Sequence, residues 1–483
     1  MLLSRVQRHA FVICAVVFAT GCGNSVSPGT SQTNSGTPHN VIQHVVIMIQ
    51  ENRSFDNLFA GFPGADTAMQ GLCKPARQTG CRVAHEIPLK AIPLAEGLPP
   101  SQQGVGKDIC HSHQCFKLEC DLDRSTKTCR NDGFNLINFG ETIGGPAAKL
   151  YPYAYVRHSD VAAYWKLAQE YAIADKMFFT ETASSFIAHQ EILSGTVRLN
   201  NHESLTDEPG STPWGCDAPH GTTVPILFSN GYENTGPAGN FPCFNEYGTI
   251  ADLLDAKNVS WKFYTYSGDQ STPHYDFSGS VWNGFDAIHK IRYGPDWKSN
   301  FSIPNTKLFG DVSGGTLPAV SYVIPTLADS DHPGSGCDGG PRWVTSVVNA
   351  IGKSRYWKNT AIVLLWDDWG GWFDNVPPPQ VNYTSLGFRV PMIVISPYAK
   401  QGYVSHTHYN FGSILQFVER TFDLGTLGTT DANANSMDDI FNFGQSPSSF
   451  RENPLPPAKK CALQTTTPRE DRKIVKYNRG APD

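Results

Sequence analysis

Short apolar runs alternate along the chain with amphipathic stretches, which predict strands and helices respectively. The apolar run His44–Gln50 is typical of a strand buried on both faces of a parallel sheet. Further strands are predicted at Ser260–Tyr266, Val320–Ile324, Thr360–Trp366 and Val390–Ile395, and helices at Val161–Ala172, Ser184–Leu193, Thr249–Lys257, Arg342–Ile351 and Asn410–Phe422. This alternation predicts a three-layer α/β/α sandwich with a central, mostly parallel sheet and long loop insertions.

The composition fits a loop-rich enzyme. The chain has 483 residues with 44 glycines and 34 prolines, and only 17% of its residues are charged. The low charge excludes a mostly disordered chain, and the glycine and proline content disfavours a helical bundle. The net charge is −6 without a marked run of Lys or Arg, so no nucleic-acid partner is expected.

The N-terminus has the pattern of an export signal. Basic residues precede the apolar run Phe11–Ala19, which is too short to span a membrane. Ala19–Cys22 resembles the bacterial lipobox, so we predict a lipoprotein-type signal peptide at 1–21 and a tether at 22–40; an ordinary signal peptide is the alternative. We expect a cell-envelope protein attached by a lipid on Cys22. Residue 23 is Gly and not the Asp that often retains lipoproteins at the inner membrane, which favours the outer membrane; a periplasmic or secreted protein is the alternative. A catalytic domain at 41–430 and a packed C-terminal tail at 431–483 complete the predicted organisation.

Export predicts that the cysteines are paired, because an oxidising compartment favours disulfides. Ten cysteines follow Cys22, enough for five bridges, at positions 73, 81, 110, 115, 120, 129, 216, 243, 337 and 461. Cys73 with Cys81, and Cys216 with Cys243, are expected local pairs. The group 110/115/120/129 predicts two bridges, or a zinc site as the alternative. Cys461 is expected to pin the tail to the domain.

Acidic and amide side chains follow two of the predicted strands directly. Glu51 and Asn52 come after His44–Gln50, and Asp367 and Asp368 come after Thr360–Trp366. Adjacent carboxylates at the end of a buried strand are costly unless a cation neutralises them, and these oxygen ligands suit a divalent metal ion. Helix caps or a solvated turn are the alternative for either site alone.

The segment His44–Asp56 closely resembles the opening motif of the phosphoesterase family of bacterial phospholipases C and acid phosphatases. Four further blocks resemble the family in the same order: Ala174–Phe179 with Ser184–Gln190 and Ser194–Thr196; Asp329–Pro333 with Trp343–Ile351; Trp366–Asp374 with Val376–Pro379; and Arg389–Pro397 with Ser413–Glu419. The resemblance extends over about 41–424. It implies an alkaline-phosphatase-like fold and hydrolysis of phosphate esters.

The resemblance also implies roles for individual residues. Ser185 aligns with the nucleophile, with Ser184 as the alternative, and the divalent metal ion, of unknown identity, is held by Glu51, Asn52, Asp367 and Asp368. His111 and His332 are the candidates for protonating the leaving group or binding phosphoryl oxygens, and His189 and His406 are further candidates.

The implied substrate is a phosphodiester such as a phospholipid head group. An acid phosphatase acting on monoesters is the second hypothesis, and a catalytically silent binding protein on the same fold is the third. Trp369 and Trp372 could hold a choline cation, although packing is the simpler role for both.

Several positions depart from the family pattern. The acidic block usually contains Glu and then His where this chain has Asp368 and Trp369, and Asn375 and Phe411 replace two other common histidines.

A separate motif, Cys73–Arg77, fits the Cys-x-Pro-x-Arg core of sulfatases. The Thr-Gly that should follow comes too early, and Cys81 offers a disulfide partner, so we treat sulfatase chemistry as a minor alternative.

Overall fold

The computed structural model describes residues 41–95, 108–234, 239–379, 386–458 and 461. The chain divides into Met1–Asn34 and Ser35–Asp483, and every described residue belongs to the second part. The predicted signal peptide, tether and lipidated cysteine lie outside the described residues. Within the described ranges, no helix is both long and apolar enough to cross a bilayer.

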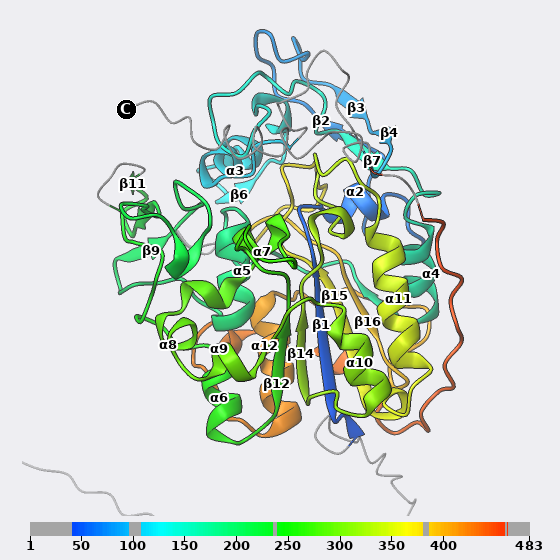
Figure 1. Cartoon of the computed structure of the whole chain (residues 1–483). Coiled ribbons are helices and arrows are strands. Elements are labelled where there is room, and N and C mark those ends of the chain that lie inside the picture. Colours follow the sequence, from blue (N-terminus) through cyan, green and yellow to red (C-terminus); the bar gives the residue numbers. More distant parts are fainter. Residues whose placement is uncertain (1–40, 96–107, 235–238, 380–385, 459–460, 462–483) are drawn as a thin grey trace, which may run out of the picture. The chain divides into compact units, whose positions relative to one another are not determined.

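An eight-stranded sheet forms the core (Figure 1). Its strand order is β13 (Phe301–Ser302), β12 (Trp261–Tyr264), β14 (Val320–Val323), β1 (His44–Gln50), β15 (Thr360–Trp366), β16 (Met392–Ile395), β8 (Ala172–Ala174) and β17 (Tyr403–Ser405). All neighbouring pairs are parallel except the two that involve β16. The central strands are buried on both faces, which explains their continuous apolar sequences.

Helices cover both faces of the sheet. In Figure 1, α4 (Ala162–Glu170), α10 (Lys307–Gly314) and α11 (Gly340–Gly352) lie on one side of the central strands. The other side carries α5 (Ser185–Ser194), α6 (Ile250–Ala256) and α12 (Phe411–Phe422). In α11 the buried valines 344, 347 and 348 and Ile351 follow the helical repeat and face the sheet. The predicted three-layer fold with a mostly parallel sheet is confirmed.

The observed elements differ from the predicted ones mainly at their ends. The predicted helix Val161–Ala172 stops at Glu170, and Ala172–Ala174 forms β8 instead. The short strands β13 and β17 were not predicted, because two or three residues carry too little periodicity to be recognised. In contrast, the predicted bounds of β1 and β15 are those of the structure.

The cysteine-rich segment forms an insertion beyond the carboxyl ends of the strands, in light blue and cyan in Figure 1. It contains short helices and strands as well as the loops that the predicted insertions imply. Its elements are β2 (Gln70–Leu72), β3 (Glu86–Pro88), β4 (Lys90–Ile92), α3 (His113–Cys120), β5 (Leu122–Asp123) and β6 (Thr128–Cys129). In the sequence, α2 (Phe55–Phe59) precedes them and β7 (Ala154–Val156) follows them. A second group of short elements comprises β9 (Glu203–Leu205), β10 (Ile226–Phe228), β11 (Glu233–Asn234), α7 (Phe277–Val281), α8 (His289–Arg292) and α9 (Asp296–Ser299).

Five disulfides pair all ten cysteines that follow Cys22. The predicted local pairs Cys73–Cys81 and Cys216–Cys243 are confirmed. The group 110/115/120/129 forms two bridges, Cys110–Cys115 and Cys120–Cys129, and therefore not a zinc site. Cys461 pairs with Cys337, which ties residue 461 to the loop before α11.

The C-terminal segment lies against α11 and the turn that follows it. Asn349 Nδ2 donates to the carbonyl oxygen of Asn453 at 2.7 Å, and the Asn453 amide donates back to Asn349 Oδ1 at 3.0 Å. Trp357 donates its indole N–H to the Ser448 carbonyl oxygen at 2.8 Å. The predicted boundary at residue 430 remains a prediction.

Candidate functional site

The carboxyl ends of β1 and β15 meet at one edge of the sheet. These neighbouring parallel strands are in register, with Gln50 opposite Trp366, so the residues that follow both strands are brought together. The Asn52 amide donates to Asp367 Oδ1 at 2.7 Å, and the Asp367 amide donates to the Gln50 carbonyl oxygen at 2.9 Å. Glu51, Asn52, Asp367 and Asp368 are all fully buried.

A glycine turn holds the acidic pair against Asn52. Gly370 has a left-handed φ of 61°, and its amide donates to Asp368 Oδ1 at 2.7 Å. A methyl carbon at Gly370 would lie 2.3 Å from the Asn52 carbonyl oxygen, so only glycine allows this approach. Asn52 itself has a left-handed φ of 54°, a conformation that asparagine tolerates better than most residues.

Ser185 is the first residue of α5, and its hydroxyl points at the strand ends. Its Oγ lies 3.0 Å from Asp368 Oδ2 and 3.4 Å from Asn52 Oδ1, and donates to either. Ser184 precedes the helix, and its buried hydroxyl has no hydrogen-bond partner in the described part of the chain. Of the two candidate serines, Ser185 contacts the cluster.

His189 lies one helical turn after Ser185 and faces the same cluster. Its Nε2 is 3.2 Å from Glu51 Oε1 and 4.0 Å from Asp367 Oδ2. One ligand atom from each of these three buried residues lies within 4.8 Å of the others. We predicted His189 only as an alternative acid or phosphoryl-binding group, whereas the geometry offers it as a metal ligand. The i, i+4 spacing from Ser185 is the signal that could have shown this.

The electrostatics of the cluster fit a divalent cation. Burial, together with the negative charge of Asp367, raises the pKa of Glu51 and of Asp368 well above the ordinary values. Asp367 Oδ2 is buried without a hydrogen bond within the described residues. Burial lowers the pKa of His189 to about 4, which keeps the imidazole in the neutral form that binds metals. Carboxylates, an amide and an imidazole together form a suitable donor set for such a cation.

His111 enters the site from the insertion. The carbonyl oxygen of Ile109 can only accept, so the proton of neutral His111 is on Nδ1, which donates to it at 2.7 Å. The other ring nitrogen, Nε2, lies 3.0 Å from Asn52 Nδ2 and 4.0 Å from Asp368 Oδ2. Burial lowers the pKa of His111, but the negative charges around it, chiefly that of Asp368, raise it more, so the net shift is upward.

His332 lies beside Asp108, which also lies near His111. The carboxylate oxygens of Asp108 are 3.8 Å from His111 Nδ1 and 3.9 Å from His332 Nε2. Burial, with the positive charge of His111, lowers the pKa of His332 to about 4. His406 is 58% exposed and pairs with Asp175 at 2.8 Å. No contact between His406 and the acidic cluster is found among the described residues.

A model of the phosphoesterase family matches residues 42–425. The chain belongs to the phosphoesterase family. It is 26% identical over 439 residues to a non-hemolytic phospholipase C from Burkholderia pseudomallei, covering 79% of this chain and 55% of that protein. It is 25% identical over 461 residues to phospholipase C A of Mycobacterium tuberculosis, covering 85% of this chain and 79% of that one. The chain thus spans about half the length of the Burkholderia relative.

Among solved structures, the chain is similar to a protein of the alkaline phosphatase superfamily from Vibrio parahaemolyticus. The identity is 14%, the similarity covers 58% of this chain and 65% of that one, and the TM-score is 0.33. A similarity of this size carries no information about function.

Two of the positions that depart from the family pattern, Trp369 and Asn375, take structural roles, as does the neighbouring Trp372. Trp369 is fully buried and donates its indole N–H to Glu119 Oε2 at 2.9 Å. Trp372 is 1% exposed and lies under the Arg53 guanidinium. Neither side chain is accessible to a choline cation. Asn375 pairs with Arg389.

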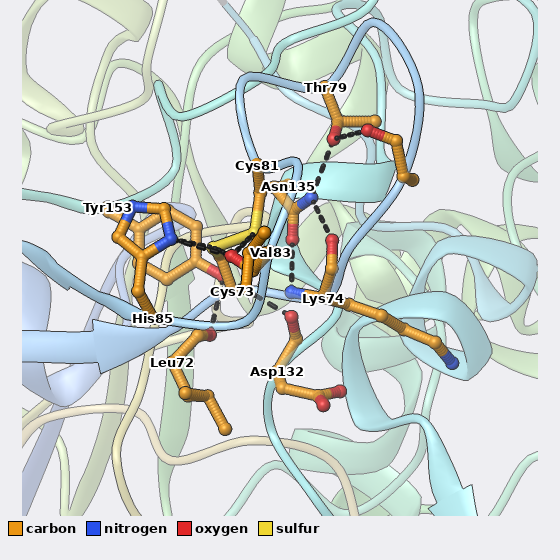
Figure 2. Close-up of a disulfide and its surroundings, with 11 residues drawn as sticks. Leu72, Cys73, Lys74, Thr79, Cys81, Val83, His85, Asp132, Asn135 and Tyr153 are labelled. Atoms are coloured by element: carbon orange, nitrogen blue, oxygen red, sulfur yellow. Dashed lines mark hydrogen bonds between the residues drawn. A yellow bond between two sulfur atoms is a disulfide. The ribbon is translucent and has the colours of Figure 1, made fainter.

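Cys73 is not a free thiol. It is fully buried and bonded to Cys81 in the loop that precedes β3 (Figure 2). His85 lies beside this pair, but a disulfide has no thiolate to offer a metal ion or a modifying enzyme. The structure therefore removes the sulfatase interpretation of Cys73–Arg77.

Proposed function

We propose that this chain hydrolyses phosphoric esters with Ser185 as the nucleophile. The observation that carries the proposal is the contact of Ser185 Oγ with Asp368 Oδ2 and Asn52 Oδ1 beside a buried acidic cluster. Membership of the phosphoesterase family and relatives named phospholipase C support this class of reaction. The proposed substrate is a phosphodiester, with a phospholipid head group as first choice.

The residues around Ser185 supply the groups for attack on phosphorus. As Oγ bonds to phosphorus, its proton passes to Asp368 Oδ2, the nearest acceptor at 3.0 Å. Ser185 opens α5, so the free backbone N–H groups of the first turn favour an anionic phosphoryl group at this position.

Glu51, Asn52, Asp367, Asp368 and His189 are the residues proposed to hold a divalent cation. When bound, the cation supplies positive charge that lowers the pKa of the serine hydroxyl and offsets charge on the phosphoryl oxygens. The chain's own part is to keep these donors desolvated and fixed. Their burial removes water, and the 2.7 Å bond from the Asn52 amide holds Asp367 in place.

The departing alcohol needs a proton, and doubly protonated His111, with its second proton on Nε2, is the better placed donor. The upward shift of its pKa favours this form. His111 Nε2 contacts the Asn52 amide group that also contacts Ser185, whereas the contact found for His332 Nε2 is with Asp108. Cleavage of the P–O bond then leaves an alcohol and a phosphoseryl enzyme. Water then attacks the phosphorus and gives one of its protons back to His111, while Asp368 returns its proton to Ser185 Oγ as the phosphate product leaves.

Export is part of the proposal. Five disulfides support folding in an oxidising compartment. The lipobox at Ala19–Cys22 supports attachment to the bacterial envelope by a lipid.

A hydrolysis panel tests the function. Wild type, Ser185→Ala and the matched control Ser184→Ala would be assayed on a chromogenic phosphorylcholine diester, a phosphate monoester and a sulfate ester. We expect diester turnover in wild type, a loss of at least about a thousandfold in Ser185→Ala, and a change within about tenfold in Ser184→Ala.

Each other outcome of the panel would show which part of the proposal is wrong. Preference for the monoester would identify an acid phosphatase, and no turnover of any ester by wild type would favour a binding protein. Loss in Ser184→Ala alone would reassign the nucleophile. Full activity in both variants and in the double variant would remove the serine mechanism.

A further inference from the structure

The disulfide loop Cys73–Cys81 forms one wall of a surface hollow on the insertion. The hollow has a volume of about 620 Å³, and Arg82, His85 and Lys149 line it together with Val83. Hydrogen bonds hold the loop in place: Asn135 Nδ2 donates to the Lys74 carbonyl oxygen at 2.8 Å and to Thr79 Oγ1 at 2.9 Å (Figure 2). Because the disulfide and these bonds already order the loop, a partner would bind it at a small entropic cost.

The charge of this loop is opposite to that of the chain. No Asp or Glu occurs between Thr67 and His85, although the net charge of the chain is −6. Lys74 pairs with Asp121, but Arg77, Arg82 and Lys149 are exposed and have no ion pair with any described residue. The nearest following acid, Glu86, accepts from Gln70.

Apolar side chains are also exposed on the hairpin that carries Arg77 and Arg82. Val83 is 72% exposed, Met69 45% and Leu72 43%. β2 and β3 pair antiparallel, so these three residues belong to one small hairpin with the basic loop at its end. Exposed apolar residues interspersed with Lys and Arg are typical of surfaces that enter the interface of a lipid bilayer.

We propose that this docking hairpin, residues 69–88 together with Lys149, binds the surface of an anionic lipid bilayer. The cations complement anionic head groups, and Val83 and its neighbours bury apolar surface that a purely ionic partner would leave in water. Lipid docking rests on the proposed function in one respect, because a phospholipid substrate gives the enzyme a reason to reach the bilayer. The binding itself requires no turnover.

Vesicle sedimentation tests the docking hairpin. The full chain carrying Cys22→Ser, to which no lipid is attached, would be mixed with vesicles of phosphatidylcholine and phosphatidylglycerol at 3:1, or of phosphatidylcholine alone. We expect tighter binding to the anionic vesicles and a loss of about 25-fold for Arg82→Ala/Lys149→Ala. Val83→Ser should lose about fivefold. The matched control Lys298→Ala/Lys307→Ala removes two exposed lysines on α9 and α10 and should bind like wild type.

Three results would overturn docking: equal binding to both vesicle types, equal loss in the control double variant, or no loss in Val83→Ser. Dextran sulfate, a polyanion without apolar parts, is the further probe. If it binds as tightly as the anionic vesicles and depends on the same two cations, the hairpin is a general polyanion site. Ser185→Ala should sediment like wild type, because the binding requires no turnover. If wild type binds the vesicles but hydrolyses no phosphate ester, that result counts against the proposed function alone.

Discussion

Replacing Gly370 with alanine should destabilise the protein and lower its activity together. The left-handed φ of 61° costs a residue with a Cβ about 1–2 kcal/mol. The new methyl carbon would also lie 2.3 Å from the Asn52 carbonyl oxygen, below the 3.0 Å that Cβ contacts observe. Relieving such a clash with backbone costs about 1–3 kcal/mol more. The expected loss in the free energy of unfolding is therefore about 2–5 kcal/mol.

Gly428→Ala is the matched control. Gly428 also has a left-handed φ, of 73°, but among the described residues, its chain neighbours aside, no heavy atom lies within 4 Å of the position its Cβ would take. The Gly428→Ala variant should lose only the cost of the left-handed φ, about 1–2 kcal/mol in the free energy of unfolding. Urea unfolding followed by tryptophan fluorescence measures both variants, and the difference between them isolates the clash.

The two variants should also differ in catalysis. The clash displaces the backbone of Asn52, whose side chain contacts both Ser185 and His111. A displacement of about 1 Å in such a site can cost about a hundredfold in rate, so kcat/KM on the phosphodiester should fall by that order in Gly370→Ala and stay near wild type in Gly428→Ala. Equal losses of stability in the two variants would refute the clash, and unchanged activity in Gly370→Ala would refute the coupling to Asn52.

Two further predictions follow from the acidic cluster and the N-terminus. Dialysis against EDTA should abolish turnover and lower the thermal midpoint, because Glu51, Asp367 and Asp368 then repel one another in a buried site; readdition of a divalent cation should restore both, and full activity in EDTA would contradict the metal site. Cys22→Ser should appear in the soluble fraction of cells or as an uncleaved precursor on a gel, and a variant that matures and fractionates with membranes like wild type would contradict the lipid anchor.

The sequence predicts the centre of the sheet better than its edges. β1 and β15 are long apolar runs because both faces of each are covered. Burial on both faces requires apolar residues at consecutive positions, and such a run can be recognised in the sequence. β13 and β17 are only two and three residues long, and each joins the sheet by pairing with one neighbouring strand through backbone hydrogen bonds, which any residue can supply. Their positions depend on tertiary contacts that leave little pattern in the sequence.

The same difference separates the parts of the candidate site. Glu51 and Asp367 could be placed together from the sequence, because each directly follows a buried strand and parallel neighbours end at one edge. His189 could not, because its distance to Glu51 depends on how α5 is rotated against the sheet. Once Ser185 is taken as the residue that faces the strand ends, however, the helical repeat requires the residue four positions later to face them too. Assigning a nucleophile at the start of a helix therefore also assigns its neighbour one turn on, and here that neighbour is a buried imidazole 3.2 Å from a carboxylate.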